Sequence, residues 1–196
     1  MDLVPAPVRR VMATLEARDQ ADRIDGTPMS RRLRAISPDV GEFLLTLALG
    51  TRAQTIVEIG TSSGYSTLWL AVAAQHNDGR VITYEVDPAK VQLARTTFAD
   101  AGVGDRVELR DSDGSAGLTS FAGTADLVFL DAEKDDYLGM LEPAIQALRP
   151  GGMLVADNLT SHESALAEFR DTALADSRLS ALVVPIGRGE LVAVRL

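Results

Sequence analysis

The chain has 196 residues, of which 46% are hydrophobic and 24% are charged, as expected for one globular domain that buries a sizeable core. Its formal net charge is -9 and its pI is about 4.7, so its average surface repels a phosphate backbone and nucleic acid is excluded as an expected partner. Zero cysteines exclude disulfides, thiolate metal ligands and a cysteine nucleophile, and they are compatible with a reducing cytoplasm.

The first 50 residues predict a helical cover that precedes the main fold. Two helical patterns, at about residues 8–23 and 38–49, are separated by a turn at residues 25–28. They either cover a ligand or form a dimer surface. Arg31, Arg32 and Arg34 cluster between them, and solvated surface is the simpler interpretation. Because no apolar run approaches the ~20 residues of a membrane span and no signal pattern opens the chain, we expect a cytoplasmic protein with no membrane partner.

From residue 55 onward, short β-branched runs alternate with longer helical patterns. Repeated units of this kind predict a doubly wound α/β fold with a mostly parallel sheet, in a single domain of residues 1–196. Residues 182–194 predict two more strands joined by a short glycine-containing turn, which makes them antiparallel and brings the sheet to seven strands. The other predicted strands are residues 55–59, 81–85, 107–110, 126–130 and 153–156, and the predicted helices between and after them include residues 68–73, 88–101, 137–148 and 162–175.

The turn after the first of these strands is the main binding signal. Residues 56–66 read as a strand, a glycine-bracketed loop and a helix start, which is where an α/β sheet holds a nucleoside-bearing ligand. The spacing is Glu-x-Gly-x-x-x-Gly, from Glu58 through Gly60 to Gly64. Ser62 stands where a dinucleotide fold needs its second glycine, so the loop suits a ligand without a pyrophosphate.

Acidic residues follow several of the predicted strands, at the sheet edge where such folds bind ligands. Glu85 lies 25 residues after Gly60, near the offset at which an acid accepts hydrogen bonds from ribose hydroxyls. The alternative is an exposed strand-end acid beside Asp87, which itself fits a helix N-cap. Ser112 and Asp113 are candidates for contact with an adenine, although a plain turn explains them nearly as well.

A second group of polar residues ends two further strands. Asp131, Asp157 and Asn158 would meet at the sheet edge, and hard oxygen ligands of this kind suit Mg²⁺, Mn²⁺ or Ca²⁺. The alternative is a set of helix caps and loop hydrogen bonds. His162 fits a loop or cap histidine better than a further ligand.

Three segments taken together resemble the cation-dependent O-methyltransferases, the family of the caffeoyl-CoA and catechol O-methyltransferases. They are residues 57–66, residues 129–137 (Phe-Leu-Asp-Ala-Glu-Lys-Asp-Asp-Tyr) and residues 156–158 (Ala-Asp-Asn), and the similarity extends from about residue 29 to residue 196. The resemblance implies a Rossmann-like sheet, S-adenosylmethionine as cofactor, and one divalent cation, with Mg²⁺ favoured over Mn²⁺ and Ca²⁺. Its members are often dimers, which implies a homodimer.

The resemblance also implies roles for individual residues. Asp131, Asp157 and Asn158 would hold the cation, and Lys134 would face the substrate hydroxyl beside Asp131. Ser66 would lie near the methionine carboxylate of the cofactor, Glu85 on its ribose, and Ser112 and Asp113 near its adenine. The implied cofactor-binding residues are Glu58, Gly60, Thr61, Ser62, Gly64, Ser66, Glu85, Val86, Ser112, Asp113 and Asp131.

The chemistry of the implied reaction accounts for these residue types. A phenol titrates near pH 10, so only about one in a thousand is ionised at neutral pH, a deficit of roughly 4 kcal/mol. A divalent cation offsets much of this deficit and fixes the oxygen in line with the methyl group. Lys134 would then accept the proton or, if it stays charged, steady the phenolate. The alternative for Lys134 is a solvated side chain in a polar loop.

The acceptor and two competing functions remain open at this stage. No insertion loop that would grip a large acyl-CoA is apparent between residues 161 and 174, which favours a small catechol-like aromatic acceptor. One alternative is a metal-independent methyltransferase in which Asp157 and Asn158 bind the acceptor. Another is a non-catalytic nucleoside-binding protein.

Overall fold

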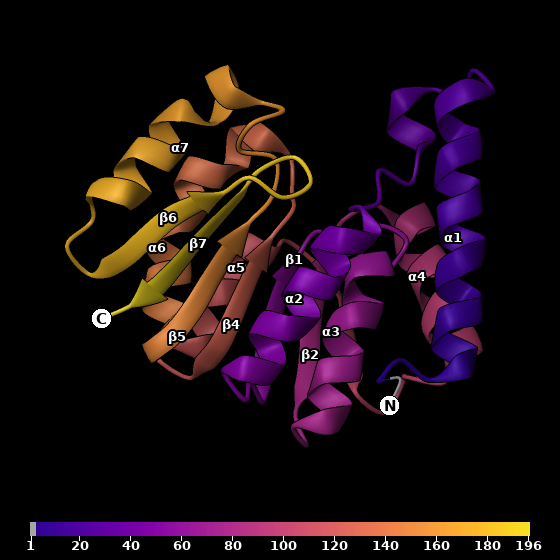
Figure 1. Cartoon of the computed structure of the whole chain (residues 1–196), viewed down its shortest axis with the longest axis horizontal. Helices are drawn as coiled ribbons and strands as arrows, with labels where there is room; N and C mark the ends of the chain where they lie inside the picture. Colours follow the sequence, from indigo (N-terminus) through magenta and orange to yellow (C-terminus); the bar gives the residue numbers. More distant parts are fainter. Residues whose placement is uncertain (1–2) are drawn as a thin grey trace.

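A single mixed sheet of seven strands forms the centre of the molecule in the computed structural model, which describes residues 3–196 (Figure 1). Its strand order is β3-β2-β1-β4-β5-β7-β6. The first five strands run parallel to one another, and β7 is antiparallel to both β5 and β6. The predicted doubly wound sheet with a C-terminal antiparallel hairpin is therefore confirmed. The strands are β1 (Thr55–Ile59), β2 (Arg80–Glu85), β3 (Val107–Asp111), β4 (Ala125–Leu130), β5 (Leu148–Ala156), β6 (Leu179–Val184) and β7 (Glu190–Arg195).

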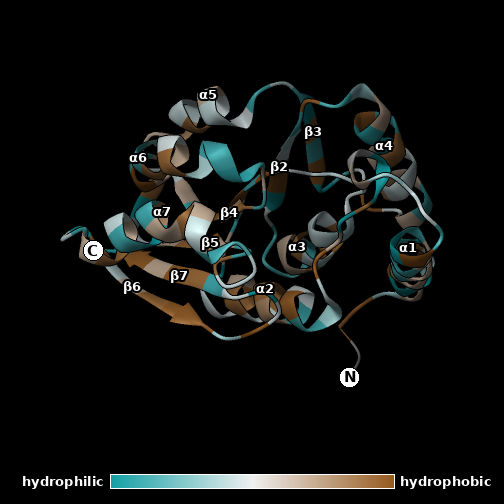
Figure 2. Ribbon diagram, turned by 90° about the horizontal axis from the view of Figure 1, so that it is seen from above, coloured by the Kyte–Doolittle hydropathy of each residue, from teal (hydrophilic) through white to brown (hydrophobic). Residues whose placement is uncertain are grey.

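Helices cover both faces of this sheet (Figure 2). The longer helices agree with the predicted ones within a few residues at each end, and α4 has the predicted bounds. The short α5 and three 3-10 turns were not predicted. The helices are α1 (Ala6–Ile24), α2 (Pro38–Gly50), α3 (Tyr65–His76), α4 (Pro88–Ala101), α5 (Gly114–Leu118), α6 (Tyr137–Ala147) and α7 (Glu163–Ala175), and the 3-10 turns are η1 (Met29–Arg31), η2 (Thr119–Phe121) and η3 (Lys134–Asp136).

Two hydrophobic cores lie on opposite faces of the sheet. On one face, α3 packs between the sheet and α2, and ten of its residues are buried, which explains its apolar sequence on all sides. On the other face, α6 and α7 pack together, and the rings of Tyr137 and Phe169 meet edge to face at 5.2 Å between their centroids. Both cores leave the carboxyl ends of the parallel strands free to carry polar residues.

The predicted N-terminal cover is present as α1 and α2. Helix α1 packs against α3 and α4, and α2 packs against α3 (Figure 1). The segment between them carries Leu33, whose backbone N–H donates to the buried Asp22 carboxylate and whose carbonyl accepts from Ser62. The cover is thereby tied to the loop that follows β1. Within residues 3–196, no helix is both long enough and apolar enough to span a membrane.

Strand β5 begins earlier than predicted, at Leu148 instead of residue 153. Leu148 pairs with Ala125 of β4, and the register then shifts before Met153 pairs with Leu127. The shift accommodates Pro150 and two glycines, residue types that normally interrupt a strand.

Candidate active site

The carboxyl ends of the parallel strands open onto a cavity of about 710 Å³. Its wall combines these strand ends with the segment between α1 and α2, including Met29 and Leu33. The cover therefore reaches the cavity, as one of its two predicted roles required. Of the predicted site residues, the wall includes Gly60, Ser62, Glu85, Val86, Ser112, Asp113, Asp131, Lys134 and Asn158, whereas Glu58, Thr61, Gly64, Ser66 and Asp157 lie outside it.

The loop between β1 and α3 passes unusually close to the end of β4. Gly60 has a φ of 100°, and a β-carbon at this position would lie 2.2 Å from the carbonyl oxygen of Asp131. Only glycine fits this approach. Ser62, at a φ of 47°, donates its backbone N–H to Glu85 and its hydroxyl to the carbonyl of Leu33, both at 2.8 Å. The loop is thus fixed from three sides.

Glu58 lies behind this loop and supports it from within the core. Its fully buried carboxylate accepts hydrogen bonds from the hydroxyls of Ser66, Thr67 and Thr83. Burial raises the pKa of Glu58 to about 7, although the three hydroxyls oppose that shift. The structure thus shows Glu58 and Ser66 bonded to each other, and it shows how an acid in β1 orders the first turn of α3.

Glu85 ends β2 and is buried, so it is not the exposed strand-end acid of the alternative interpretation, whereas Asp113 follows β3 in a capping turn. The Glu85 carboxylate accepts the backbone N–H groups of Ser62, Val86 and Asp87 and also lines the cavity. Asp87 caps α4 by accepting the N–H of Ala89 at 2.8 Å. Likewise, Asp113 lines the cavity while it caps α5.

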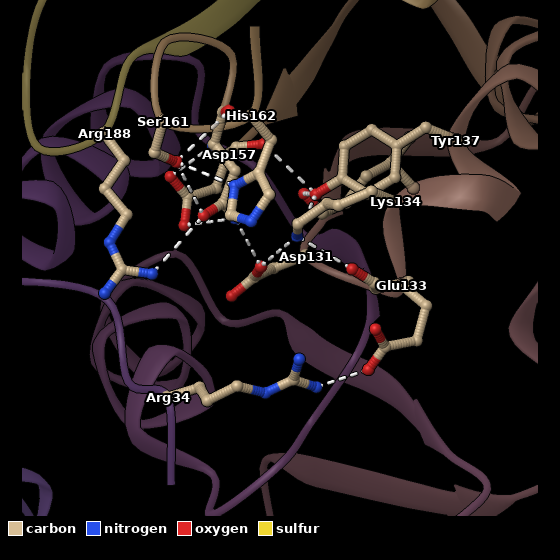
Figure 3. Close-up of polar contacts among 12 residues, drawn as sticks. Arg34, Asp131, Glu133, Lys134, Tyr137, Asp157, Ser161, His162 and Arg188 are labelled. Atoms are coloured by element: carbon tan, nitrogen blue, oxygen red, sulfur yellow. Dashed lines mark hydrogen bonds and ion pairs between the residues drawn. The ribbon is translucent and has the colours of Figure 1, made fainter. Parts of the chain in front are cut away.

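Asp131, Asp157 and Asn158 do come together at the ends of β4 and β5 (Figure 3). The Asn158 side-chain nitrogen lies 3.0 Å from Asp131 Oδ1 and 2.9 Å from Asp157 Oδ2. Burial and the negative charge of Asp157 raise the pKa of Asp131 to about 6, while the Lys134 charge acts in the opposite direction. The two carboxylates therefore repel each other across a single amide group.

This cluster has the donor chemistry for a divalent cation. Within residues 3–196, no group of three or more His, Cys, Asp or Glu side chains is arranged to hold a metal, so the third ligand would have to be Asn158. Its amide nitrogen faces the carboxylates, while its oxygen faces Ser161 and Arg188. A half-turn of the amide would direct the oxygen toward the carboxylates and complete a set of three hard oxygen donors.

Lys134 points into this cluster and is only 17% exposed at its side chain. Its Nζ donates to the carbonyl of Ala132 at 2.8 Å and lies 3.4 Å from Asp131 Oδ1. The hydroxyl of the buried Tyr137 contacts the carbonyls of Leu130 and Asp157 at 3.0 and 3.2 Å and so joins the ends of β4 and β5. A freely solvated lysine, the alternative interpretation, does not match this environment.

Three ionisable residues near the cluster were not selected from the sequence as site residues, although Arg34 was named in an arginine cluster. Glu190 begins β7 and is fully buried, and burial together with the charge of Asp157 raises its pKa to about 11. Arg188 lines the cavity from the turn before β7. Arg34 pairs with Glu133 and thereby joins the N-terminal cover to the loop after β4 (Figure 3). Of these three residues, Glu190 alone had a signal in the sequence, because it is an acid in an otherwise apolar predicted strand.

His162 occupies the position that a cap histidine would take. It precedes α7, is exposed, and its Nδ1 lies 3.0 Å from the hydroxyl of Ser161. Of the clustered arginines, Arg32 and Arg34 belong to the cavity wall. Both therefore line the cavity, and Arg34 is at the same time exposed to solvent.

Comparisons with known proteins identify the family. Residues 27–196 match the model of a family described as O-methyltransferase. A Mycobacterium tuberculosis protein named catechol O-methyltransferase is 40% identical over 138 residues, which cover 70% of this chain and 62% of that protein. An O-methyltransferase from Bacillus cereus, solved in complex with SAH (S-adenosylhomocysteine), superimposes with a TM-score of 0.80 at 27% identity, over 95% of this chain and 91% of the other. TomG from Streptomyces achromogenes, an O-methyltransferase solved with SAM (S-adenosylmethionine), superimposes with a TM-score of 0.78 at 29% identity, over 92% of this chain and 88% of the other. The resemblance drawn from the motifs is thereby confirmed, and this chain belongs to the O-methyltransferase family.

Proposed function

We propose that this enzyme transfers a methyl group from S-adenosylmethionine to one hydroxyl of a small catechol-like acceptor, with the help of a divalent cation. The observation that carries the proposal is the convergence of Asp131, Asn158 and Lys134 at one end of the cavity, with Asp157 directly behind them and bonded to Asn158. The name of the Mycobacterium tuberculosis relative supports a catechol as acceptor.

The other end of the cavity is suited to the cofactor. Ser62 and Glu85 present a hydrogen-bonded loop and a carboxylate, and we assign Glu85 to the ribose hydroxyls. Ser112 and Asp113 lie in the same wall, and we assign them to the adenine. The Bacillus cereus and Streptomyces achromogenes structures, solved with SAH and SAM, support this cofactor.

The acceptor end supplies charge and orientation. Asp131, Asp157 and Asn158 would hold the cation, and a bound cation would supply the Lewis acidity that makes a phenol ionise near neutral pH. Lys134 would receive the proton of the reacting hydroxyl at its Nζ or, when charged, pair with the phenolate. The Tyr137 hydroxyl keeps the ends of β4 and β5 at a fixed separation, which sets the distance between the two carboxylates.

Methyl transfer from labelled S-adenosylmethionine to a panel of catechols, measured with Mg²⁺ and again with EDTA, tests the proposal. We expect transfer that requires the metal and is lost in Asp157→Ala. The matched control is Asp100→Ala, which removes an exposed carboxylate on α4 outside the cavity wall. Cofactor binding without transfer to any catechol would contradict the proposal.

A metal-independent methyltransferase is the second candidate, and one observation favours it. The Asn158 side-chain nitrogen bridges both carboxylates, so each carboxylate has a hydrogen-bond donor from within the protein. In that case Asp157 and Asn158 would bind the acceptor directly. Transfer that is insensitive to EDTA would identify this mechanism.

We also propose that the enzyme acts in the cytoplasm as a homodimer. The absence of cysteines supports the compartment, because a reducing environment does not select for disulfides. Exposed apolar side chains on the described surface outside the cavity wall, such as Ile24 at 83% and Leu182 at 55%, are available for contact with a second subunit.

A further inference from the structure

Arg188 is a cationic side chain of the cavity wall that has no acidic partner. Its Nη1 lies 3.5 Å from Asn158 Oδ1, and within residues 3–196 no carboxylate lies within ion-pair distance of its guanidinium. Of the other cationic wall residues, Arg34 pairs with Glu133 and Lys134 with Asp131, whereas Arg32 and Lys90 likewise form no ion pair within residues 3–196. In Figure 3, Arg188 approaches the acidic cluster from the side opposite to Lys134.

The turn that carries Arg188 is closely packed and fastened to the segment after β5. A β-carbon on Gly187 would lie 2.3 Å from Val40, and one on Gly189 would lie 2.5 Å from Thr160. Both glycines have positive φ, at 55° and 86°. The carbonyl of Arg188 accepts the backbone N–H of Thr160 at 2.8 Å. This arginine is therefore held in place at its backbone, with its side chain half-buried, and is not a loose surface residue.

The acidic cluster would not compensate the positive charge of Arg188 once a cation is bound to it. A single amide group, that of Asn158, separates its guanidinium from the carboxylates of Asp131 and Asp157. A divalent cation on those carboxylates would neutralise their attraction for the guanidinium. If Asn158 turned its oxygen to that cation, its NH₂ group would face Arg188, and two donors would oppose each other. A neutral catechol would leave this positive charge uncompensated at the acceptor end.

We propose that the acceptor is a catechol that carries a carboxylate substituent and that Arg188 binds this carboxylate. The planar guanidinium presents two parallel N–H donors, which match a carboxylate better than any neutral substituent. This inference rests on the proposed function, because it assigns the substrate class of the same site. Arg188 is a specificity-determining residue in this view, and the methyl transfer itself does not require it.

The test compares two acceptors of nearly equal shape, 3,4-dihydroxybenzoate and its neutral amide, 3,4-dihydroxybenzamide. We expect the wild-type enzyme to prefer the carboxylate by about 10-fold or more in kcat/KM, the ratio of one charge-assisted hydrogen-bonded pair. Arg188→Gln should raise KM for the carboxylate by about the same factor, with kcat and the amide kinetics little changed. Arg188→Lys should lie between them, because it keeps the charge and loses the fork.

Calorimetric binding of 3,4-dihydroxybenzoate in the presence of S-adenosylhomocysteine gives a second readout that is independent of turnover. Its Kd should rise in Arg188→Gln and stay unchanged in the control Arg95→Gln, which removes an exposed arginine on α4. Equal use of both acceptors by the wild type, or equal losses for both in Arg188→Gln, would overturn the inference while the proposed function stands. Transfer to other catechols of the panel but to neither of these two would also overturn the inference alone, and transfer to no catechol at all would overturn both together.

Discussion

The buried Glu58 makes the stability of this protein depend on pH in a way that one substitution removes. Its pKa rises from 4.5 to about 7 on folding, because burial disfavours its charge. Between these values the unfolded chain has released the proton and the folded chain still binds it, so the free energy of unfolding falls as pH rises. The contribution is fully present below pH 4.5 and is lost by the time pH passes 7.

The size of the effect follows from the linkage relation. One pKa unit corresponds to about 1.4 kcal/mol, so the full window amounts to about 3 kcal/mol, and the part between about pH 5.5 and pH 7 amounts to about 2 kcal/mol. The side chain is fully buried, so solvent does not screen this interaction. Measurements should stay well above pH 4.7, because at its pI the chain carries little net charge and associates readily.

Urea unfolding of the wild type and Glu58→Gln, from about pH 5.5 to about pH 8 without cofactor and with EDTA, measures this difference. We expect the variant to gain about 2 kcal/mol relative to the wild type across the window, because a neutral amide does not titrate. Glu168→Gln, at an exposed position of α7, is the control and should show a constant difference. A difference for Glu58→Gln that stays constant with pH would refute the reasoning.

Three further predictions concern the metal, the loop and the assembly. The affinity for Mn²⁺, followed by electron paramagnetic resonance, should fall about tenfold per pH unit below about pH 6. The reason is that the pKa of Asp131 is raised to about 6 and only the ionised carboxylate binds a cation. An affinity that does not change with pH would exclude Asp131 as a ligand. Gly60→Ala should lower the free energy of unfolding by about 2 kcal/mol or more, since its β-carbon would collide with the Asp131 carbonyl. Gly139→Ala is the control and should raise the free energy of unfolding by about 0.5–1 kcal/mol, because no atom lies within 4 Å of its new β-carbon. Equal effects of the two substitutions in thermal unfolding would contradict this prediction. Light scattering after size exclusion should give the mass of a dimer at micromolar concentration, and a clean monomer would disprove the proposed assembly.

Local chemistry explains why most of the fold was predictable from the sequence. The bounds of α4 follow from residues at its own two ends. Asp87 caps its start and is followed by a proline, and Gly102 ends it in the left-handed conformation. The early start of β5 was missed, because Pro150 and the glycines after it are typical of a break and only their pairing with β4 keeps them in the sheet.

The site was predictable where strand ends defined it and not where distant segments meet. Asp131 and Asn158 lie 27 residues apart in the chain, yet both follow parallel strands, so their contact follows from topology. Arg188 reaches the same cluster from an antiparallel hairpin, and a turn between two strands gives no sign of what its side chain faces. Glu58 shows a related limit, because alternation along β1 does not reveal that its carboxylate accepts hydrogen bonds from two hydroxyls of α3, and its assignment to the cofactor stays a prediction.

The insertion of β7 between β5 and β6 has a consequence for the synthesis of this protein. The chain up to Val194, which pairs with Met153, has to leave the ribosome before β5 gains the whole of its second neighbour. Until then β5 is an open edge with apolar residues such as Leu154 and Val155, and an open edge of this kind pairs readily with other chains. Stalled or truncated chains that lack β7 should therefore aggregate, and a chaperone that shields this edge would raise the yield of folded enzyme.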